Sequence, residues 1–267
     1  MIYVCIPSHN EAPTVGLLLW KIRQVFTGFP REYHLLVVDD GSTDATAEVL
    51  EPYARVLPLT LIRHDTRRGY AASVEALLRT AVERTDRPKR DSAILMHADF
   101  AHAPSYLPDL VRRLESGADV VVAQSALAGE ASLARRLVRR IGPMLLRGRV
   151  QAPGVSDVVS GFMALRLITL RHAFRAQEGA LLTADGWSAN AELIGRTARV
   201  ARRVETITAV ERHDLRHRAS RVHPWQTAMA LWRSRGALRL PPAPPPPTQP
   251  RPDRRAAEPA GAATSDT

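Results

Sequence analysis

Cysteine, lysine and long apolar runs are scarce in this chain of 267 residues. The single cysteine, Cys5, excludes an intrachain disulfide and fits a reducing compartment. No apolar run approaches the ~20 residues that a membrane-spanning helix needs, and the chain opens on a strand pattern rather than on a charged and then apolar signal sequence. We therefore expect a soluble cytoplasmic protein, with peripheral contact at the cytoplasmic face of a membrane left open.

Positive charge comes almost entirely from arginine, because Lys21 and Lys89 are the only lysines. The formal net charge is +10, and nine arginines against three acids between residues 201 and 239 place six of these charges in one segment. Such a segment suits phosphates, nucleic acid or an anionic membrane surface. No nucleic-acid recognition motif accompanies it, so we expect no nucleic-acid partner.

Short apolar runs alternate with longer amphipathic stretches through the first 124 residues. This alternation predicts an α/β fold, with a mostly parallel sheet sandwiched by helices, in which ligands bind at the carboxyl ends of the strands. The strands are predicted at residues 3–7, 34–39, 59–63, 93–97 and 119–123, and the helices at residues 14–26, 42–53, 70–83 and 105–115.

The pattern loosens in the second half of the chain. Helices are predicted at residues 132–147, 164–174, 188–201 and 224–238, and a strand at residues 206–210. The helix at 224–238 carries tryptophans beside arginines, which suits either a membrane surface or packing onto the core. The run PPAPPPPTQPRP then excludes a helix or a central strand, so we expect one domain, 1–239, and a disordered proline-rich tail, 240–267.

Polar clusters follow three of the predicted strands: IPSHNEA, VVDDGSTDAT and HADFAHAP. The adjacent acids Asp39 and Asp40 repel each other unless a cation, a donor group or water compensates them. The second cluster is therefore either a polar turn aimed at a ligand or a set of turn and helix-capping residues, with Ser42, Thr43 or Asp44 as the cap. Phosphoacceptor receiver domains also carry acids at a strand end. They need a lysine at a later strand end, however, and no lysine follows residue 89.

Together the three clusters resemble family 2 glycosyltransferases of the GT-A fold. VVDDGSTDAT matches the second-strand signature of that family almost letter for letter, IPSHNEA looks like its first-strand motif, and MHADFAHAP resembles its D-x-D region. The resemblance sharpens towards the dolichyl- or polyprenyl-phosphate mannose synthase branch, because SDVVSGFMALR, GWSANAEL and RASRV look like its later segments, in order. It implies a nucleotide-sugar-binding half at 1–124 and an acceptor half at 125–239.

The resemblance implies an inverting transferase that takes its sugar from a nucleotide-diphosphate sugar. On that basis Asp40 accepts from the base, and Asp99 is the carboxylate that holds Mn²⁺ or Mg²⁺ at the diphosphate. The donor-binding positions that it carries over to this chain are Pro7, Asn10, Glu11, Asp39, Asp40, Gly69 and Ala98.

The D-x-D region departs from the pattern of the branch, because His97 stands where the first metal carboxylate is expected. Imidazole ligates Mn²⁺ but is a poor ligand for Mg²⁺. Three alternatives follow. A cation is held through Asp99, the diphosphate and water, with help from His97; the site works with little or no metal; or catalysis has been lost.

Other departures affect the sugar and the acceptor. Ser125 replaces an arginine expected near the donor, and Ala189 and Asn190 replace an aromatic residue and a glutamine. The resemblance therefore does not imply that the transferred sugar is mannose.

The acceptor is expected to carry a phosphate, as polyprenyl phosphate does. The resemblance places Arg218 and Arg221 at the acceptor phosphate, and arginine suits phosphate through its bidentate fork. A solvated basic face is the alternative for this segment. A phosphate needs no strong general base, whereas a hydroxyl acceptor needs a carboxylate, for which Asp185 and Glu192 are the candidates. Glu192 is equally suited to a structural ion pair.

Two further functions remain open. A nucleotidyltransferase also combines a parallel sheet with carboxylates, but it usually opens with a glycine-rich basic loop, which IPSHNEAPT lacks. The second is a protein that binds a nucleotide sugar without catalysis, which stays an alternative because a histidine replaces an acid in the D-x-D region.

Overall fold

The computed structural model describes residues 1–127, 146, 150–211, 229 and 232–233. The predicted helices at 132–147 and 224–238 and the predicted tail at 240–267 lie almost entirely outside these residues. Among the described residues, no helix combines the length and the apolar character needed to span a bilayer.

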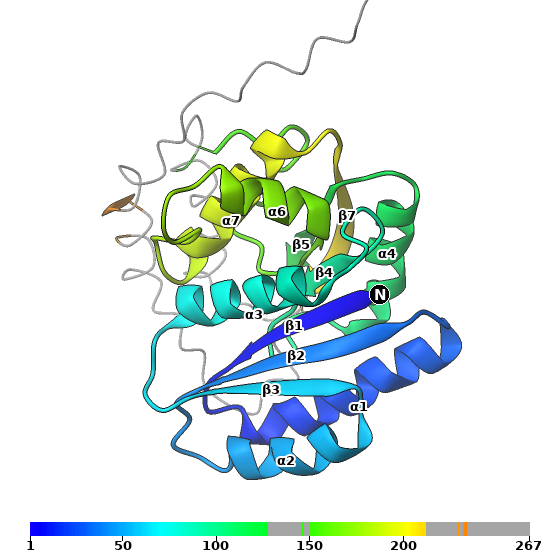
Figure 1. The fold of residues 1–267 in the computed structure, drawn as a ribbon, viewed down its shortest axis with the longest axis vertical. Coiled ribbons are helices and arrows are strands. Elements are labelled where there is room, and N and C mark those ends of the chain that lie inside the picture. Colours follow the sequence, from blue (N-terminus) through cyan, green and yellow to red (C-terminus); the bar gives the residue numbers. More distant parts are fainter. Residues whose placement is uncertain (128–145, 147–149, 212–228, 230–231, 234–267) are drawn as a thin grey trace, which may run out of the picture.

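A seven-stranded sheet forms the centre of the described fold, in the strand order β3-β2-β1-β4-β6-β5-β7 (Figure 1). Strands β1 to β4 are parallel to one another, and β5 is parallel to β7. Only β6 runs against its neighbours, β4 and β5. The prediction of a mostly parallel α/β sheet is confirmed. The strands are β1 (Ile2–Ser8), β2 (Tyr33–Asp40), β3 (Leu59–His64), β4 (Ser92–Leu95), β5 (Val120–Leu127), β6 (Met163–Arg166) and β7 (Val204–Glu211).

Helices cover both faces of the sheet. One apolar cluster joins α3, α6 and α7 to one face, and a second joins α1, α2 and α4 to the other (Figure 1). Every residue of β1 is buried, because Tyr3 and Cys5 point into the first cluster while Val4 and Ile6 point into the second. The helices are α1 (Ala12–Gly28), α2 (Thr46–Val56), α3 (Tyr70–Arg84), the 3₁₀ turn η1 (Pro104–Tyr106), α4 (Leu107–Glu115), α6 (Leu167–Arg175) and α7 (Trp187–Val200).

The prediction of one helix over residues 164–174 is wrong at its start. Met163–Arg166 form β6, and the helix begins only at Leu167. A four-residue apolar run has no periodicity that separates a strand from a helix. Here it pairs on both sides with strands, which buries it between β4 and β5. The fourth strand also ends earlier than predicted, at Leu95.

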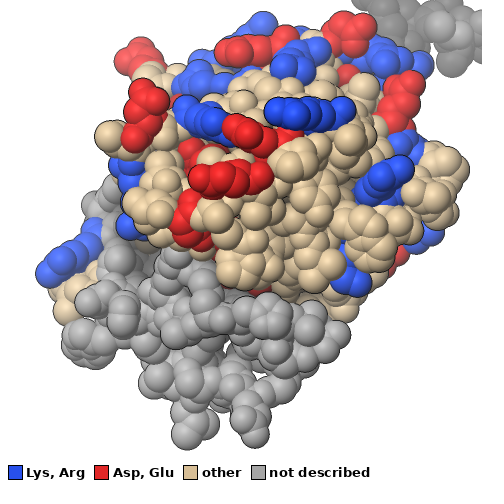
Figure 2. Space-filling model, turned by 90° about the horizontal axis from the view of Figure 1, so that it is seen from below, with Lys and Arg blue, Asp and Glu red and all other residues tan. Residues whose placement is uncertain are grey.

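Charges are mixed on the side of the molecule that carries α1 and α2. Figure 2 shows acidic and basic side chains interspersed around a largely uncharged area on the described part of this face. The large apolar side chains exposed on these two helices are Leu17, Trp20 and Val56. This described face therefore offers no surface of a single charge sign.

Candidate functional site

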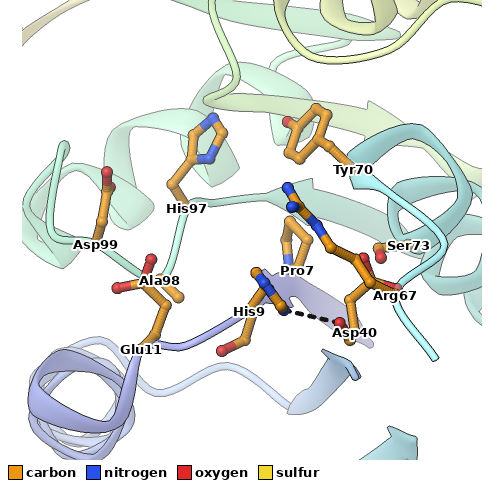
Figure 3. A pocket seen from close by; sticks show the side chains of 11 residues that line it. Pro7, His9, Glu11, Asp40, Arg67, Tyr70, Ser73, His97, Ala98 and Asp99 are labelled. Atoms are coloured by element: carbon orange, nitrogen blue, oxygen red, sulfur yellow. Dashed lines mark hydrogen bonds between the residues drawn. The ribbon is translucent and has the colours of Figure 1, made fainter. Parts of the chain in front are cut away.

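The strand ends with polar clusters meet at one edge of the sheet. Parallel pairing sets Ser8 beside Asp39 and Cys5 beside Leu95, so the segments that follow β1, β2 and β4 emerge together. They enclose a pocket of about 170 Å³ (Figure 3). Its lining residues are Pro7, Ser8, His9, Glu11, Asp40, Arg67, Tyr70, Ser73, His97, Ala98 and Asp99.

The pocket contains six of the residues expected at the site: Pro7, Glu11, Asp40, His97, Ala98 and Asp99. Asp40 and Asp99 lie on opposite sides of it, with His9, Pro7 and Arg67 between them (Figure 3). Asn10, Asp39 and Gly69 are not part of its lining. They contact loops that shape it.

Asp40 anchors the loop between β3 and α3. Its carboxylate accepts hydrogen bonds from Nδ1 of His64 (2.7 Å), the backbone N–H of Arg68 (2.8 Å) and the backbone N–H of Gly69 (2.9 Å). Burial alone would raise the pKa of the Asp40 carboxyl, but these hydrogen bonds outweigh burial and hold the pKa below its usual value. The carboxylate is thus ionised and fixed in the pocket wall.

Gly69 is required by this loop for two reasons. Its φ of 94° lies in the region that only glycine adopts easily, and a β-carbon there would lie 3.1 Å from Oδ2 of Asp185. Oδ1 of Asp185 accepts from the backbone N–H of Ala71 (2.9 Å) at the start of α3. Asp185 is exposed beside the pocket rather than in its lining.

A second set of hydrogen bonds ties the segment after β1 to the segment after β2. The backbone N–H of Asn10 donates to Oγ of Ser42 (2.9 Å), and Oδ1 of Asn10 accepts from the backbone N–H of Thr43 (2.7 Å). Asp44 accepts from the backbone N–H of Thr46 (3.0 Å), as a capping residue does, although Ala45 occupies the N-cap position of α2. Asn10 therefore holds the rim of the pocket.

His97 is packed between two other segments of the chain. Its ring stacks on Tyr70, with centroids 5.3 Å apart and planes 11° from parallel. A β-carbon at Gly161 would lie 2.0 Å from Nε2 of His97, so this edge of the ring lies directly against the glycine. The hydroxyl of Tyr70 donates to Oδ1 of Asn190 (2.8 Å), and burial raises the pKa of Tyr70, which keeps this phenol protonated.

The metal ligands expected from the sequence were His97 and Asp99. The described residues contain no group of three or more His, Cys, Asp or Glu side chains placed to hold a metal ion. Oδ1 of Asp99 accepts from the backbone N–H of Ala101 (3.0 Å), and Nε2 of His97 is turned to Gly161. These residues do not fit a cation held by two acids.

Glu192 is fully buried and already bonded. Its carboxylate accepts from the backbone N–H groups of Thr183 (2.7 Å) and Ala184 (3.0 Å) and from the hydroxyl of Thr183 (2.8 Å), and it pairs with Arg196. These contacts favour the structural alternative for Glu192, which shapes the loop that carries Asp185. Arg218 and Arg221, expected at the acceptor phosphate, lie outside the described residues, and the side chain of Ser125 is not described either.

Five pocket residues were not among those expected from the sequence: Ser8, His9, Arg67, Tyr70 and Ser73. Arg67 forms no ion pair among the residues that the structure describes, and its side chain points into the pocket (Figure 3). Oγ of Ser8 is buried and has no hydrogen-bond partner in the described part of the chain. The run Arg67-Arg68-Gly69 after a predicted strand end was a signal for Arg67. Nothing in the sequence pointed to Tyr70.

Comparison with known proteins shows the family of the chain. The sequence profile of Glycosyl transferase family 2 matches residues 3–173. Dolichol-phosphate mannosyltransferase of Pyrococcus furiosus is 28% identical over 170 residues, which make up 61% of this chain and 45% of that protein. Undecaprenyl-phosphate 4-deoxy-4-formamido-L-arabinose transferase of Pseudomonas fluorescens is 31% identical over 118 residues, 44% of this chain and 33% of that protein. The chain thus spans less than half the length of these relatives.

Solved structures share the fold. Glucosyl-3-phosphoglycerate synthase from Mycobacterium tuberculosis, in complex with Mn²⁺, UDP and glucosyl-3-phosphoglycerate, has a TM-score of 0.58 at 20% identity and covers 89% of this chain and 78% of its own. S. aureus TarS 1–349 in complex with UDP has a TM-score of 0.56 at 17% identity and covers 88% and 64%. The prediction of a GT-A fold is confirmed.

Proposed function

Because the chain belongs to glycosyl transferase family 2, we propose that it moves a sugar, with inversion, from a nucleotide-diphosphate sugar to an acceptor that carries a phosphate, such as polyprenyl phosphate. The main observation that supports binding of a nucleotide-diphosphate sugar is the pocket. Three segments with the motifs of the family converge on it, and Arg67 points into it without an ion pair among the described residues.

The nucleotide is assigned to the side of Asp40. A carboxylate offers about four lone-pair positions, of which His64 and two backbone N–H groups use three. One position is left in the pocket wall, which suits an N–H of a base. The buried hydroxyl of Ser8 is a further group that a bound nucleotide would satisfy.

The diphosphate is assigned to Arg67. Its guanidinium lies between Asp40 and the rings of Tyr70 and His97 (Figure 3), and it binds phosphate oxygens through a bidentate fork. When the bond between the anomeric carbon and the diphosphate breaks, its electron pair leaves with the diphosphate. A fixed positive charge at that place stabilises the developing negative charge.

The acceptor attacks the anomeric carbon from the opposite face, which inverts the configuration. A phosphate acceptor is already ionised at neutral pH, so the reaction needs no strong base. This agrees with a site in which Glu192 is occupied by structural hydrogen bonds. The names of the two relatives, which act on dolichol phosphate and undecaprenyl phosphate, support this acceptor class, and Arg218 and Arg221 remain its proposed ligands.

A divalent cation takes no part in the proposed steps. Among the described residues, no group of three or more His, Cys, Asp or Glu side chains is placed to hold an ion such as the Mn²⁺ in the complex of the mycobacterial synthase.

Product analysis tests the proposal. Purified protein would be incubated with UDP-, GDP- and dTDP-sugars and undecaprenyl phosphate, and lipid products would be identified by mass spectrometry. Undecaprenol, which lacks the phosphate, is the matched control. We expect glycosylated undecaprenyl phosphate and no product from undecaprenol. Equal transfer to undecaprenol would favour a hydroxyl acceptor with Asp185 as base, and binding without any product would favour an inactive nucleotide-sugar-binding protein.

A further inference from the structure

We infer that this chain binds its nucleoside diphosphate without a divalent cation, because His97 is a fixed part of the pocket wall and Arg67 meets the diphosphate in place of a metal. The inference rests on the proposed function, since it concerns the donor of the same reaction.

The first step of the argument is the position of the His97 ring. Tyr70 covers one face of the imidazole, and Gly161 meets its edge, since a β-carbon at Gly161 would lie 2.0 Å from Nε2 and 2.7 Å from Cδ2. The position of this added β-carbon is one bond length from the backbone of Gly161, so a metal ion about 2 Å from Nε2 on this side would clash with the glycine. To free Nε2, the ring of His97 would have to flip about its Cβ–Cγ bond or leave the stack with Tyr70.

The second step is the support behind the ring. The hydroxyl of Tyr70 donates to Asn190, and Nδ2 of Asn190 donates to the carbonyl of Val159 (3.2 Å). These bonds join α3, α7 and the segment before β6 around the imidazole. A β-carbon at Gly161 would also lie 3.1 Å from Nδ2 of Asn190, so this glycine faces both side chains. His97 and Asn190, the two side chains that depart from the family pattern here, therefore both face Gly161.

The third step concerns the ligands that remain. With Nε2 against Gly161, the pair His97 and Asp99 offers one imidazole nitrogen and one carboxylate. Mg²⁺ and Mn²⁺ prefer several oxygen ligands, so this pair alone holds either ion weakly, and most of the ligands of a bound ion would have to come from the diphosphate and water.

The fourth step concerns charge. The histidine removes a carboxylate that would repel a diphosphate, and the carboxylate of Asp40 is compensated by its own donors. Arg67 then lines the pocket as a cation that has no ion pair among the described residues, while Glu11 and Asp99 are the other charged side chains in the lining. A diphosphate thus meets a positive charge that belongs to the protein.

Titration calorimetry of the full chain with UDP, GDP and dTDP, each with Mn²⁺ and with chelator, tests the inference. We expect the best of the three nucleotides to bind with dissociation constants that differ by less than about threefold between the two conditions. Binding that is more than about tenfold tighter with Mn²⁺ would overturn the inference and leave the proposed function standing. Binding of none of the three would overturn the proposed function and the inference with it.

A gain-of-function variant sharpens the test. In His97→Asp a second carboxylate returns beside Asp99, so we expect nucleotide binding to become at least about tenfold tighter with Mn²⁺ than with chelator. Absence of this new response would show that position 97 does not determine the use of a cation, which also contradicts the inference.

Gly161→Ala tests the packing separately. The added β-carbon must displace the ring of His97, so we expect weaker nucleotide binding in this variant, whereas adding the same change to His97→Ala should lower affinity no further. Thermal unfolding of each variant shows that the compared proteins are folded. Equal losses of affinity in both backgrounds would mean that the glycine does not act through His97.

Discussion

The imidazole of His97 lies face to face with the phenol ring of Tyr70, at a centroid distance of 5.3 Å. Two segments far apart in the chain, the one after β4 and the first residue of α3, thus form one wall of the pocket. The hydroxyl of Tyr70 extends this wall to Asn190 on α7. The stack and the hydrogen bond are separate contributions, and substitutions of Tyr70 distinguish them.

Tyr70→Phe keeps the ring and removes the hydroxyl. It should lower the free energy of unfolding by about 1–3 kcal/mol, because Oδ1 of the buried Asn190 loses its donor. Nucleotide affinity should stay within about threefold, since the stack remains. Tyr70→Ala should weaken nucleotide binding further, and equal affinity in both variants would contradict a role for the stack. Urea unfolding and calorimetry provide the two measurements.

Gly69→Ala should lower the free energy of unfolding by about 1–3 kcal/mol, because its φ of 94° is strained for alanine and the new β-carbon approaches Asp185. Gly28→Ala is the matched control, since a β-carbon at Gly28 meets nothing within 4 Å. Urea unfolding should show almost no loss for the control. Equal losses in both variants would mean that the loop after β3 does not depend on the conformation of Gly69.

Asp40→Asn should destabilise the protein in a pH-dependent way. The folded pKa of Asp40 is lowered, so its contribution is fully present above the unfolded value of about 3.9 and disappears as pH falls through the folded pKa. The difference in unfolding free energy between wild type and variant should be about 1–3 kcal/mol at pH 7 and shrink below about pH 4. A difference that stays constant down to pH 3 would argue against an ionised, hydrogen-bonded Asp40.

Asp185→Asn and Glu192→Gln test whether each acid acts as a general base or stabilises the fold. Glu192→Gln should lower the free energy of unfolding by about 3 kcal/mol or more, because it leaves the buried charge of Arg196 without its partner. Asp185→Asn should retain transfer to a phosphate acceptor within about tenfold, since that reaction needs no strong base. Loss of all transfer in Asp185→Asn, with folding intact, would indicate a hydroxyl acceptor instead.

The strands and helices of the first half were predictable because their apolar residues repeat with clear periods, and parallel strands bring their carboxyl ends to one edge. These patterns predict that the segments carrying Asp40 and Asp99 meet at one pocket, whereas Pro7 was expected there only from the resemblance to the family. The strand Met163–Arg166 was not predictable from its own residues, because only pairing with two neighbours makes it a strand.

Other features depend on contacts between distant segments. Tyr70 reaches the pocket because Asp40 binds the loop before α3, and the edge of His97 faces Gly161 rather than open space. The sequence showed that a histidine had replaced an acid. The sequence did not predict the direction in which the nitrogen atoms of that histidine point.

The most direct test of the central claim, that this pocket holds the nucleoside diphosphate of the donor, is the nucleotide affinity of Arg67→Ala measured beside Arg68→Ala. The two arginines are neighbours in one loop, but only Arg67 lines the pocket, and Arg68 contributes its backbone N–H to Asp40. Loss of a charge-assisted contact predicts that Arg67→Ala binds the nucleotide about 10- to 100-fold more weakly, while Arg68→Ala stays within about threefold of wild type. Equal affinities in both variants and wild type would contradict the account and place the donor elsewhere.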